Sequence, residues 1–468
     1  MQTDVIIIGG GPGGYECAIR LSQYGKKVVL VERGQLGGTC LNRGCIPTKT
    51  ILHTADLYHR IQEGSSIGIC AKELSLDYDA LRTRKEQVSG QLRDGIAGLL
   101  KANGVTVVEG TGYISAPGTV EITDAQGTVT ICNAENIVAA VGSRPVLLPI
   151  PGADLEGVYT SDRILKELPE LESLTIIGGG VIGVEMACAY SQLGTQVTIL
   201  EAAEHILPLM DREISQYLGM ALKKQGVSVF AGAKVSGIRR EDGKMFCDFT
   251  DSRGNVQESA SDAVLLSVGR RPNTDRVFSE NLGITLERGR AVVDETMCAV
   301  PGIYVIGDAA AGYPQLAHAA SAQGMAVAAA IAGEPFDTDL HLVPSCVYTT
   351  PEIASVGLTE TEAKAKGIPV KTGKFLMGGN GKSLISGEER GFIKILETED
   401  GKLAGALLYC AHATDMIGEL ALAMSQGLSV HQLASVIRPH PSVEEAVGEA
   451  AETIFGLSIH TPPRRKHR

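Results

Sequence analysis

Several features are missing from this 468-residue sequence, and each absence excludes a class of protein. It has no tryptophan, and no apolar run reaches the roughly 18 residues that a membrane-spanning helix needs. Its ten cysteines lack the spacing of a disulfide scaffold or a zinc site, so no metal is expected. No secretory signal precedes the first predicted strand, which begins by Val5. We therefore expect a cytoplasmic protein, in which a functional disulfide would be catalytic rather than structural.

The charge balance is acidic. Lysine and arginine total 42 against 54 aspartates and glutamates, a formal net charge of −12 that gives no support for a nucleic-acid partner. The tail Pro462–Arg468 is basic, and we expect it to be disordered. With 44% hydrophobic and 21% charged residues, the composition is that of a globular protein, and the length predicts three or four domains.

A glycine-rich turn near the N-terminus is the first motif. The apolar run Val5–Ile8 leads into Gly9, Gly11 and Gly14 in the order G-x-G-x-x-G, followed by a helical stretch, a second apolar run and Glu32. This order places a pyrophosphate at a helix N-terminus and an acid on a ribose hydroxyl, so it predicts dinucleotide binding. The alternative is a glycine-rich turn without a ligand.

The same unit recurs further along the chain. Gly178, Gly180 and Gly183 precede Glu201, and the first glycine and the acid are 23 positions apart in both copies. Two copies predict two bound dinucleotides, as in a flavoprotein that uses a nicotinamide. Glu201 would repel a 2′-phosphate, and Ala202–Ala203 offer no arginine to hold one, which favours NAD over NADP.

Two cysteines lie in the segment GGTCLNRGCIPTK, between the two glycine motifs. Pro47 suits the first turn of a helix, so we expect a helix to begin at about Cys45, where its N-terminus would favour a thiolate. In a regular helix, residues five apart are separated by about 7.5 Å along the axis, too far for a disulfide. If Cys40 and Cys45 pair, the chain must bend, and Gly44 permits that. The alternative is two buried thiols without a redox role.

Two later segments carry candidate polar groups. Asp308 ends an apolar run, and it would either bind the ribitol of a flavin or cap the alanine-rich helix that follows. His440 is held between two prolines and suits a catalytic base, with Glu445 orienting its imidazole. The alternatives are a surface histidine, and a capping box formed by Ser442 and Glu445.

The predicted fold is α/β, with two Rossmann-like dinucleotide-binding domains and a C-terminal α+β dimerisation domain. We expect FAD-binding segments at 1–148 and 273–342, an NAD-binding domain at 149–272 and an interface domain at 343–468. In the last of these, a hairpin turns at Asp400–Gly401. The helix predicted over Ala413–Gln426 has an apolar face that would serve either the core or a subunit interface.

Taken together, the motifs of this sequence resemble those of the pyridine nucleotide–disulfide oxidoreductases over essentially the whole chain. GGTCLNRGCIPTK is the most specific of them, and the others are GGGVIGVE, VGRRPN, GDAA, AHAT and HPSVEE. Within the family, the enzymes that oxidise dihydrolipoamide are the most similar. Departures include Arg43, where an apolar residue is common, and Arg438 and Pro439 before His440.

The resemblance implies FAD and NAD as cofactors and a role for each site residue. Cys40 would exchange with the substrate thiol, Cys45 would lie beside the flavin, and Lys49 would approach the flavin while pairing with Glu185. His440, supported by Glu445, would act in the active site of the other subunit of a homodimer. Further cofactor contacts implied by the resemblance are Gly38, Thr39, Gly112, Gly142, Asp308 and Ala317 for FAD, and Glu201 and Gly269 for NAD.

The implied reaction oxidises dihydrolipoamide to lipoamide and reduces NAD to NADH. The implied partner is the lipoyl domain of a 2-oxo acid dehydrogenase complex or of the glycine cleavage system, with no role for nucleic acid or a membrane. Two alternatives are a disulfide reductase similar to glutathione reductase, which prefers NADPH, and a flavin-binding redox scaffold with little turnover.

Overall fold

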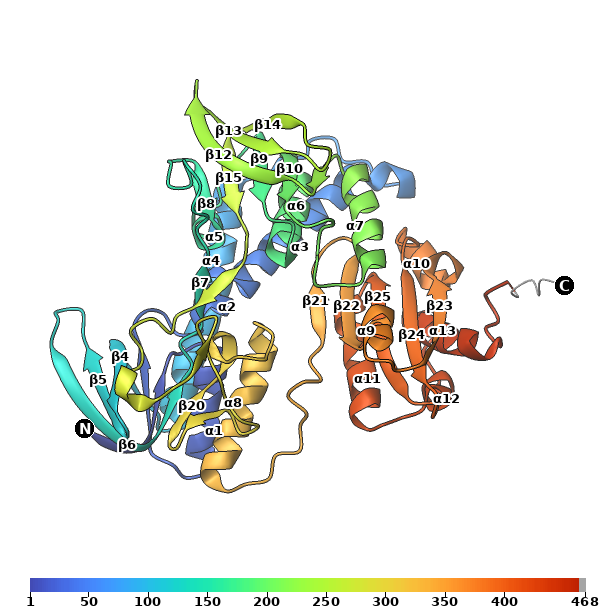
Figure 1. Ribbon diagram of the computed structural model, residues 1–468. Helices are drawn as coiled ribbons and strands as arrows, with labels where there is room; N and C mark the ends of the chain where they lie inside the picture. The colour runs from blue at the N-terminus through green and yellow to red at the C-terminus, as the bar shows by residue number, and fades with distance from the viewer. Residues whose placement is uncertain (463–468) are drawn as a thin grey trace. The chain divides into compact units, whose positions relative to one another are not determined.

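The computed structural model describes residues 1–462, so residues 463–468 of the tail expected to be disordered lie outside the described residues. The described chain forms two compact units, each built from two segments (Figure 1). The first unit comprises Met1–Leu171 and Ala263–His341, and the second comprises Glu172–Asp262 and the chain from Leu342 onward. None of the helices within residues 1–462 is long and apolar enough to cross a membrane.

An eight-stranded sheet organises the first unit. Its parallel strands run in the order β20 (Ile303–Val305), β6 (Val129–Ala139), β1 (Gln2–Ile8), β2 (Val28–Glu32) and β3 (Thr106–Glu109). Antiparallel strands complete it: β19 (Cys298–Val300) pairs with β20, β5 (Thr119–Thr123) pairs with β6, and β4 (Thr111–Ala116) pairs with β5. The run Val5–Ile8 is buried, as expected for a parallel strand covered on both faces.

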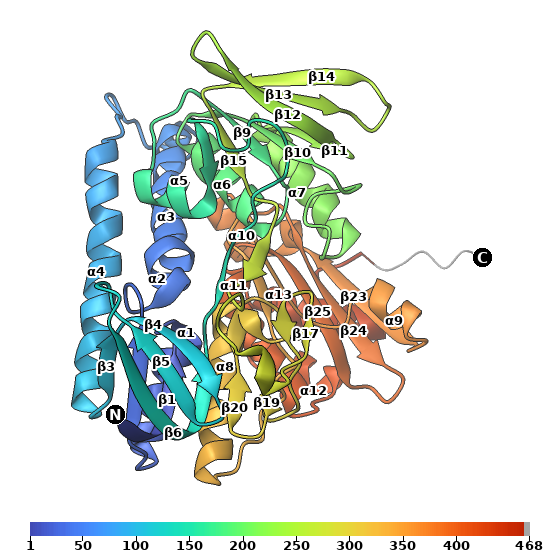
Figure 2. The ribbon, with the colours of Figure 1, turned by 60° about the vertical axis from the view of Figure 1, so that its left-hand side comes forward.

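Helices α1 (Pro12–Gln23) and α8 (Ala317–Ala332) pack against each other in this unit (Figure 2). A Cβ added to Gly13 would lie 2.8 Å from the carbonyl oxygen of Ala320, and one on Gly324 would lie 2.5 Å from that of Gly13. Glycine at both positions therefore lets the two backbones meet. The other helices of the unit are α2 (Gly38–Arg43), α3 (Cys45–Gln62), η1 (Gly64–Ile67), α4 (Tyr78–Ala102), α5 (Ser161–Glu167), η2 (Glu280–Leu282) and η3 (Gly307–Ala309).

Two similar sequence motifs form paired strands in the first unit. VGSRP and VGRRPN, more than 120 residues apart, contribute β7 (Ser143–Pro145) and β16 (Arg270–Pro272), which pair antiparallel. This pairing places Ser143 opposite Pro272 and brings the side chain of Arg270 to Ser143. The remaining short strands of the unit are β8 (Val158–Thr160), β15 (Ala263–Leu266), β17 (Leu286–Glu287) and β18 (Arg290–Ala291).

The first segment of the second unit holds the second glycine motif. Strands β9 (Ser173–Ile177), β10 (Gln196–Glu201) and β11 (Ser228–Ala231) are parallel, and α6 (Val181–Gln192) joins the first two. Helix α7 (Arg212–Lys224) connects β10 to β11, and β12 (Lys234–Glu241), β13 (Lys244–Thr250) and β14 (Val256–Ser261) form an antiparallel meander.

The second segment of this unit is an antiparallel sheet with helices. The strands run in the order β21 (Ser345–Val347), β22 (Glu352–Gly357), β25 (Leu403–Cys410), β24 (Phe392–Thr398) and β23 (Val370–Leu376). The helices are α9 (Glu360–Ala365), η4 (Met377–Gly379), α10 (Gly381–Ser386), α11 (Ala413–Ser425), α12 (Val430–Ala434) and α13 (Glu445–Phe455). Met416, Ile417 and Leu420 of α11 are buried in its core, so the predicted apolar face of this helix packs within the domain.

The predicted fold class is confirmed: the chain is α/β with repeated strand–turn–helix nucleotide-binding units and a C-terminal α+β domain. The domain boundaries predicted after residues 148, 272 and 342 stay a proposal. The hairpin predicted around Asp400–Gly401 is formed by β24 and β25.

Candidate active site

The redox segment contains the bend that the sequence requires. Helix α2 ends at Arg43 and α3 begins at Cys45, with Gly44 outside both (φ −147°, ψ −117°). A Cβ on Gly44 would lie 2.9 Å from the carbonyl oxygen of Thr39, so a side chain at this position would push the two helices apart. The two cysteines therefore belong to different helices, which removes the axial separation of a single helix.

Cys40 and Cys45 are thiols in this structure, both partly buried, and their side chains share a hydrogen bond. That bond and burial raise the pKa of Cys40, while the charge of Lys49 acts in the opposite direction. Cys45 is the first residue of an 18-residue helix, where the helix dipole favours a negative charge. The arrangement therefore favours the protonated form of Cys40.

Backbone N–H groups at the first glycine turn bind the side chain of Glu32. Its carboxylate accepts the backbone N–H of Gly10 at 2.6 Å and that of Gly34 at 2.8 Å. Gly9 has φ +108°, and a Cβ on Gly14 would lie 1.9 Å from the carbonyl oxygen of Gly9. Glycine is thus required at both positions, as the motif implies.

The second turn repeats these bonds. Glu201 accepts the N–H of Gly179 at 2.5 Å and that of Ala203 at 2.6 Å, and Gly178 has φ +107°. In both copies, then, the acid at the strand end binds the turn itself. A carboxylate accepts about four hydrogen bonds, so each retains capacity for a ribose hydroxyl.

The residues around the first turn fit a dinucleotide such as FAD. Gly11 is the N-cap of α1 and makes no side-chain capping bond, so the first N–H groups of this helix are open to an anion. Gly38, the first residue of α2, has φ +56°, and a Cβ there would lie 2.7 Å from the Cα of Gly11. The start of the redox segment thus lies against the phosphate-binding turn. At the second turn, the N-cap Gly180 also lacks a side-chain cap, and a Cβ there would meet nothing within 4 Å.

Asp308 is held by Ser143, which is held in turn by Arg270, and the sequence analysis singled out neither residue. The hydroxyl of Ser143 donates to its carboxylate, and Arg270 donates from Nε to that hydroxyl and from Nη2 to the Ser143 carbonyl, both at 2.8 Å. The alternative that Asp308 caps the alanine-rich helix is wrong, because α8 begins at Ala317 with Leu316 as its N-cap. The similarity of the motifs VGSRP and VGRRPN, which contain Ser143 and Arg270, is the sequence signal that could have identified both residues.

The remaining cofactor candidates lie on both units. In the first unit, a Cβ on Gly112 in β4 would lie 3.0 Å from Ile8, and Gly142 and Gly269 have φ +65° and +112° directly before β7 and β16. Ala317 is the first residue of α8, and Thr39 precedes Cys40 in α2. In the second unit, Gly183 is buried in α6.

The two members of the proposed Lys49–Glu185 pair belong to different units, and their pairing stays a proposal. Lys49 lies in the second turn of α3. Glu185 on α6 is only 3% exposed and accepts the N–H of Tyr348 at 3.0 Å.

His440 and Glu445 are in contact in the second unit. The imidazole Nδ1 donates to the carboxylate at 2.8 Å, and the N–H of Ser442 donates to the other oxygen at 2.9 Å. The Ser442 bond, followed by the bond from His440, lowers the pKa of Glu445. The capping box is incomplete, because Glu444 is the N-cap of α13 and the buried Ser442 hydroxyl has no hydrogen-bond partner. Glu445 therefore serves both the turn and the histidine, whose side chain is 79% exposed.

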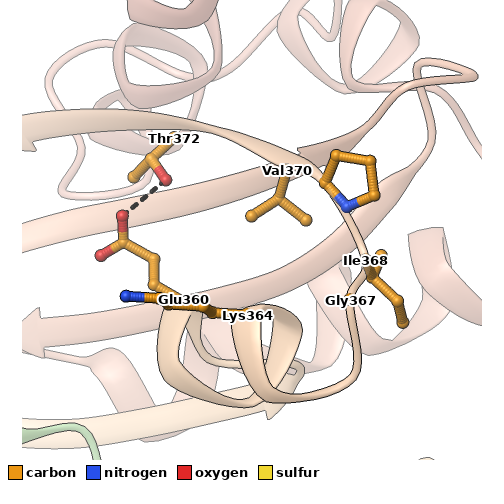
Figure 3. Close-up of a pocket in the computed structure, with 7 residues that line it drawn as sticks. Glu360, Lys364, Gly367, Ile368, Val370 and Thr372 are labelled. Atoms are coloured by element: carbon orange, nitrogen blue, oxygen red, sulfur yellow. Dashed lines mark hydrogen bonds between the residues drawn. The ribbon is translucent and has the colours of Figure 1, made fainter.

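A surface depression near α9 holds none of these residues (Figure 3). Its lining includes Glu360 and Thr372, whose hydroxyl donates to Glu360 at 2.8 Å, and Lys394 also donates to Glu360 at 2.9 Å. Glu360 is therefore held by two neighbouring side chains. Across residues 1–462, no group of three or more histidine, cysteine, aspartate or glutamate side chains could hold a metal ion.

Residues 3–324 match the profile of the family described as pyridine nucleotide-disulphide oxidoreductase, and residues 343–451 match its dimerisation domain. The chain belongs to this family. Dihydrolipoyl dehydrogenases from Bacillus subtilis and Geobacillus stearothermophilus are both 39% identical to it, with alignments covering 98% of each chain. The protein is therefore a flavoprotein disulfide reductase, an FAD-dependent oxidoreductase with a redox-active cysteine pair and a nicotinamide partner.

Solved structures of family members share its fold. LpdA from Mycobacterium tuberculosis superposes with a TM-score of 0.88 at 27% identity, covering 96% of this chain and 99% of the other. The HOCl-induced flavoprotein disulfide reductase RclA from Escherichia coli, as a Cu(II) complex, gives 0.85 at 28% identity, covering 97% and 99%. The dimerisation domain supports a homodimer.

The close approach of Gly38 to Gly11 gives a prediction for flavin binding. Gly38→Ala should lower both the flavin content of the purified protein and its Tm. The new Cβ would overlap Gly11, and a left-handed alanine costs roughly 1–2 kcal/mol. The matched control is Gly25→Ala, where φ is +81° but nothing lies within 4 Å of the added Cβ. Equal flavin content in the two variants, measured by absorbance after denaturation, would contradict the fit.

Proposed function

We propose that this protein oxidises dihydrolipoamide carried on a lipoyl domain and reduces NAD. The observation that carries the proposal is the pair of adjacent thiols at the bend between α2 and α3, together with the His440–Glu445 pair. The identity of 39% to dihydrolipoyl dehydrogenases over nearly the whole chain supports it. The partner would be the lipoyl domain of a 2-oxo acid dehydrogenase complex or of the glycine cleavage system.

In the proposed reaction, the substrate thiol gives its proton to Nε2 of His440, since Glu445 occupies Nδ1. The resulting thiolate attacks Sγ of Cys40 in the oxidised disulfide, and Cys45 leaves as a thiolate at the start of α3. The second substrate thiol then attacks the sulfur bonded to Cys40. That attack releases oxidised lipoamide, and the proton of the second thiol passes to Cys40 as its sulfur leaves, so both cysteines end reduced.

FAD and NAD, when bound, would supply the transfer of the electron pair away from the dithiol. Glu32, the first glycine turn and Asp308 would hold FAD, with contacts from Gly38, Thr39, Gly112, Gly142 and Ala317. Glu201, Gly269 and the second turn would hold NAD, because the Glu201 carboxylate disfavours the 2′-phosphate of NADP. Lys49, paired with Glu185, would lie beside the flavin.

The active site would be completed in a homodimer, with His440 acting on the cysteines of the partner subunit. Two features of the C-terminal domain support this part of the proposal. The His440 imidazole is exposed in the single chain, and neighbouring apolar side chains also face outward, including Ile437 at 97% exposure. We place the protein in the cytoplasm.

The deciding experiment is a steady-state assay with dihydrolipoamide and NAD, run beside one with glutathione disulfide and NADPH. NADH formation in the first should be faster, per mole of bound flavin, than NADPH consumption in the second. Preference for glutathione disulfide and NADPH would favour the glutathione-reductase alternative. A fully flavinated protein without turnover in either assay would favour a redox scaffold.

The dithiol makes a prediction for Cys45. Cys45→Ser should abolish dihydrolipoamide oxidation, because the disulfide can no longer form, and it should leave the bound flavin in place. Cys70→Ser is the matched control, since Cys70 is an exposed thiol outside the pair, and it should keep the parent rate. Normal dihydrolipoamide turnover by Cys45→Ser would show that the dithiol scheme is wrong.

The base makes a second prediction. His440→Gln should lower kcat/KM for dihydrolipoamide by roughly 10²–10⁴, the range of general acid–base assistance. His460→Gln is the matched control, because His460 Nδ1 donates to Glu449 on the same helix at 2.6 Å. We expect its kcat/KM to stay within about twofold of the parent value. A loss of less than tenfold in His440→Gln would remove His440 from the mechanism.

A further inference from the structure

We propose that Arg438, held by Glu419, is a positioning residue for His440: the buried ion pair fixes the backbone that presents the imidazole. The inference rests on the proposed function of His440 as the base.

The Arg438 side chain reaches back into the C-terminal domain. It is 5% exposed, and its Nη2 donates to Oε1 of Glu419 on α11 at 2.6 Å. Its Nη1 donates to the carbonyl of Leu433 near the end of α12 at 3.2 Å, and a Cβ on Gly448 of α13 would lie 3.1 Å from the same nitrogen. One side chain thus joins α11 and α12 and packs against α13, two residues before the histidine.

The other side of His440 is fixed as well. Asn380, 4% exposed at the N-cap of α10, donates from Nδ2 to the carbonyl of Ser442 at 2.9 Å. The N–H of Ser442 is bound by Glu445. The chain is therefore anchored at positions 438 and 442, while the imidazole between them projects outward and is 79% exposed.

The ion pair is poorly suited to a role in stability alone. Nε of Arg438 and Oε2 of Glu419 are both buried without a hydrogen-bond partner in the described structure. Burial raises the pKa of Glu419, Arg438 opposes the rise, and the nearby carboxyl group of Glu444 adds to it, so the pKa stays raised overall. A buried pair with two unsatisfied atoms is weak support for stability, because apolar residues of similar size often replace such pairs without loss. Fixing the geometry of the adjacent loop explains its presence better.

The test measures Arg438→Met in two backgrounds, with kcat/KM for dihydrolipoamide as the readout. In the parent protein we expect a loss of at least about tenfold, because small displacements of a catalytic group are costly. In the His440→Gln background we expect less than about twofold, because no base remains to be positioned. NADH oxidation by ferricyanide, which needs flavin and nicotinamide but no base, should be unchanged in all the variants, as should flavin content.

Equal fold losses in the two backgrounds would overturn the inference, since a general structural defect acts whether or not His440 is present. A parallel loss of ferricyanide activity would do the same. If Arg438→Met does not fold, the comparison is made with Glu419→Gln, which keeps the shape of the side chain, and with Arg438→Lys, which keeps the charge but loses the planar fork. Both should lower kcat/KM only while His440 is present.

The control is Arg60→Met, which breaks an exposed ion pair with Asp56 at 2.7 Å on α3 and should leave kcat/KM unchanged. The inference and the proposed function fail in different ways. If the parent protein does not oxidise dihydrolipoamide, the proposed function fails. If it does, and the losses are equal in both backgrounds, only the positioning role fails.

Discussion

The interruption of one helix at Gly44 is the constraint on which the site depends. Two cysteines five residues apart cannot meet along a regular helix, and here the break places Cys40 in α2 and Cys45 at the start of α3. The same break leaves α2 as a separate element, whose first residue, Gly38, lies against Gly11 of the first turn. One bend in the backbone therefore brings the sulfurs together and places the redox segment beside the predicted phosphate site.

The two glycine turns have similar sequences, and their hydrogen bonds are also similar. Glu32 and Glu201 accept hydrogen bonds from equivalent backbone groups of their own turns. The carboxylate satisfies N–H groups that a glycine-rich turn leaves without partners, and this local role is independent of any ligand. The acid at the strand end thus has a structural reason to be there in addition to its proposed contact with ribose.

The sequence predicted features that depend on neighbouring residues, and it missed contacts between residues far apart in the chain. The glycine turns, the helix start at Cys45 and the hairpin at Asp400–Gly401 each depend on residues within a short window. Whether Asp308 capped a helix or faced a ligand could not be decided from its neighbours, because the residue that binds it, Ser143, lies 165 positions away. The partner of Arg438 was missed for the same reason, since nothing near position 438 indicates that α11 supplies a carboxylate.

Helix α13 supplies the glutamate of two histidine–glutamate pairs, and comparing the pairs shows what distinguishes the proposed base. His440 bonds to Glu445 and His460 to Glu449, both through Nδ1 and both well exposed, so orientation by a carboxylate does not distinguish them. The difference lies in the backbone. His440 is flanked by a buried arginine and by a carbonyl bound to buried Asn380. The His460 N–H donates to Glu449, the same residue that binds its ring. The carboxylate fixes the tautomer in both pairs, and within residues 1–462 it is at His440 that separate elements also fix the backbone from which the imidazole projects.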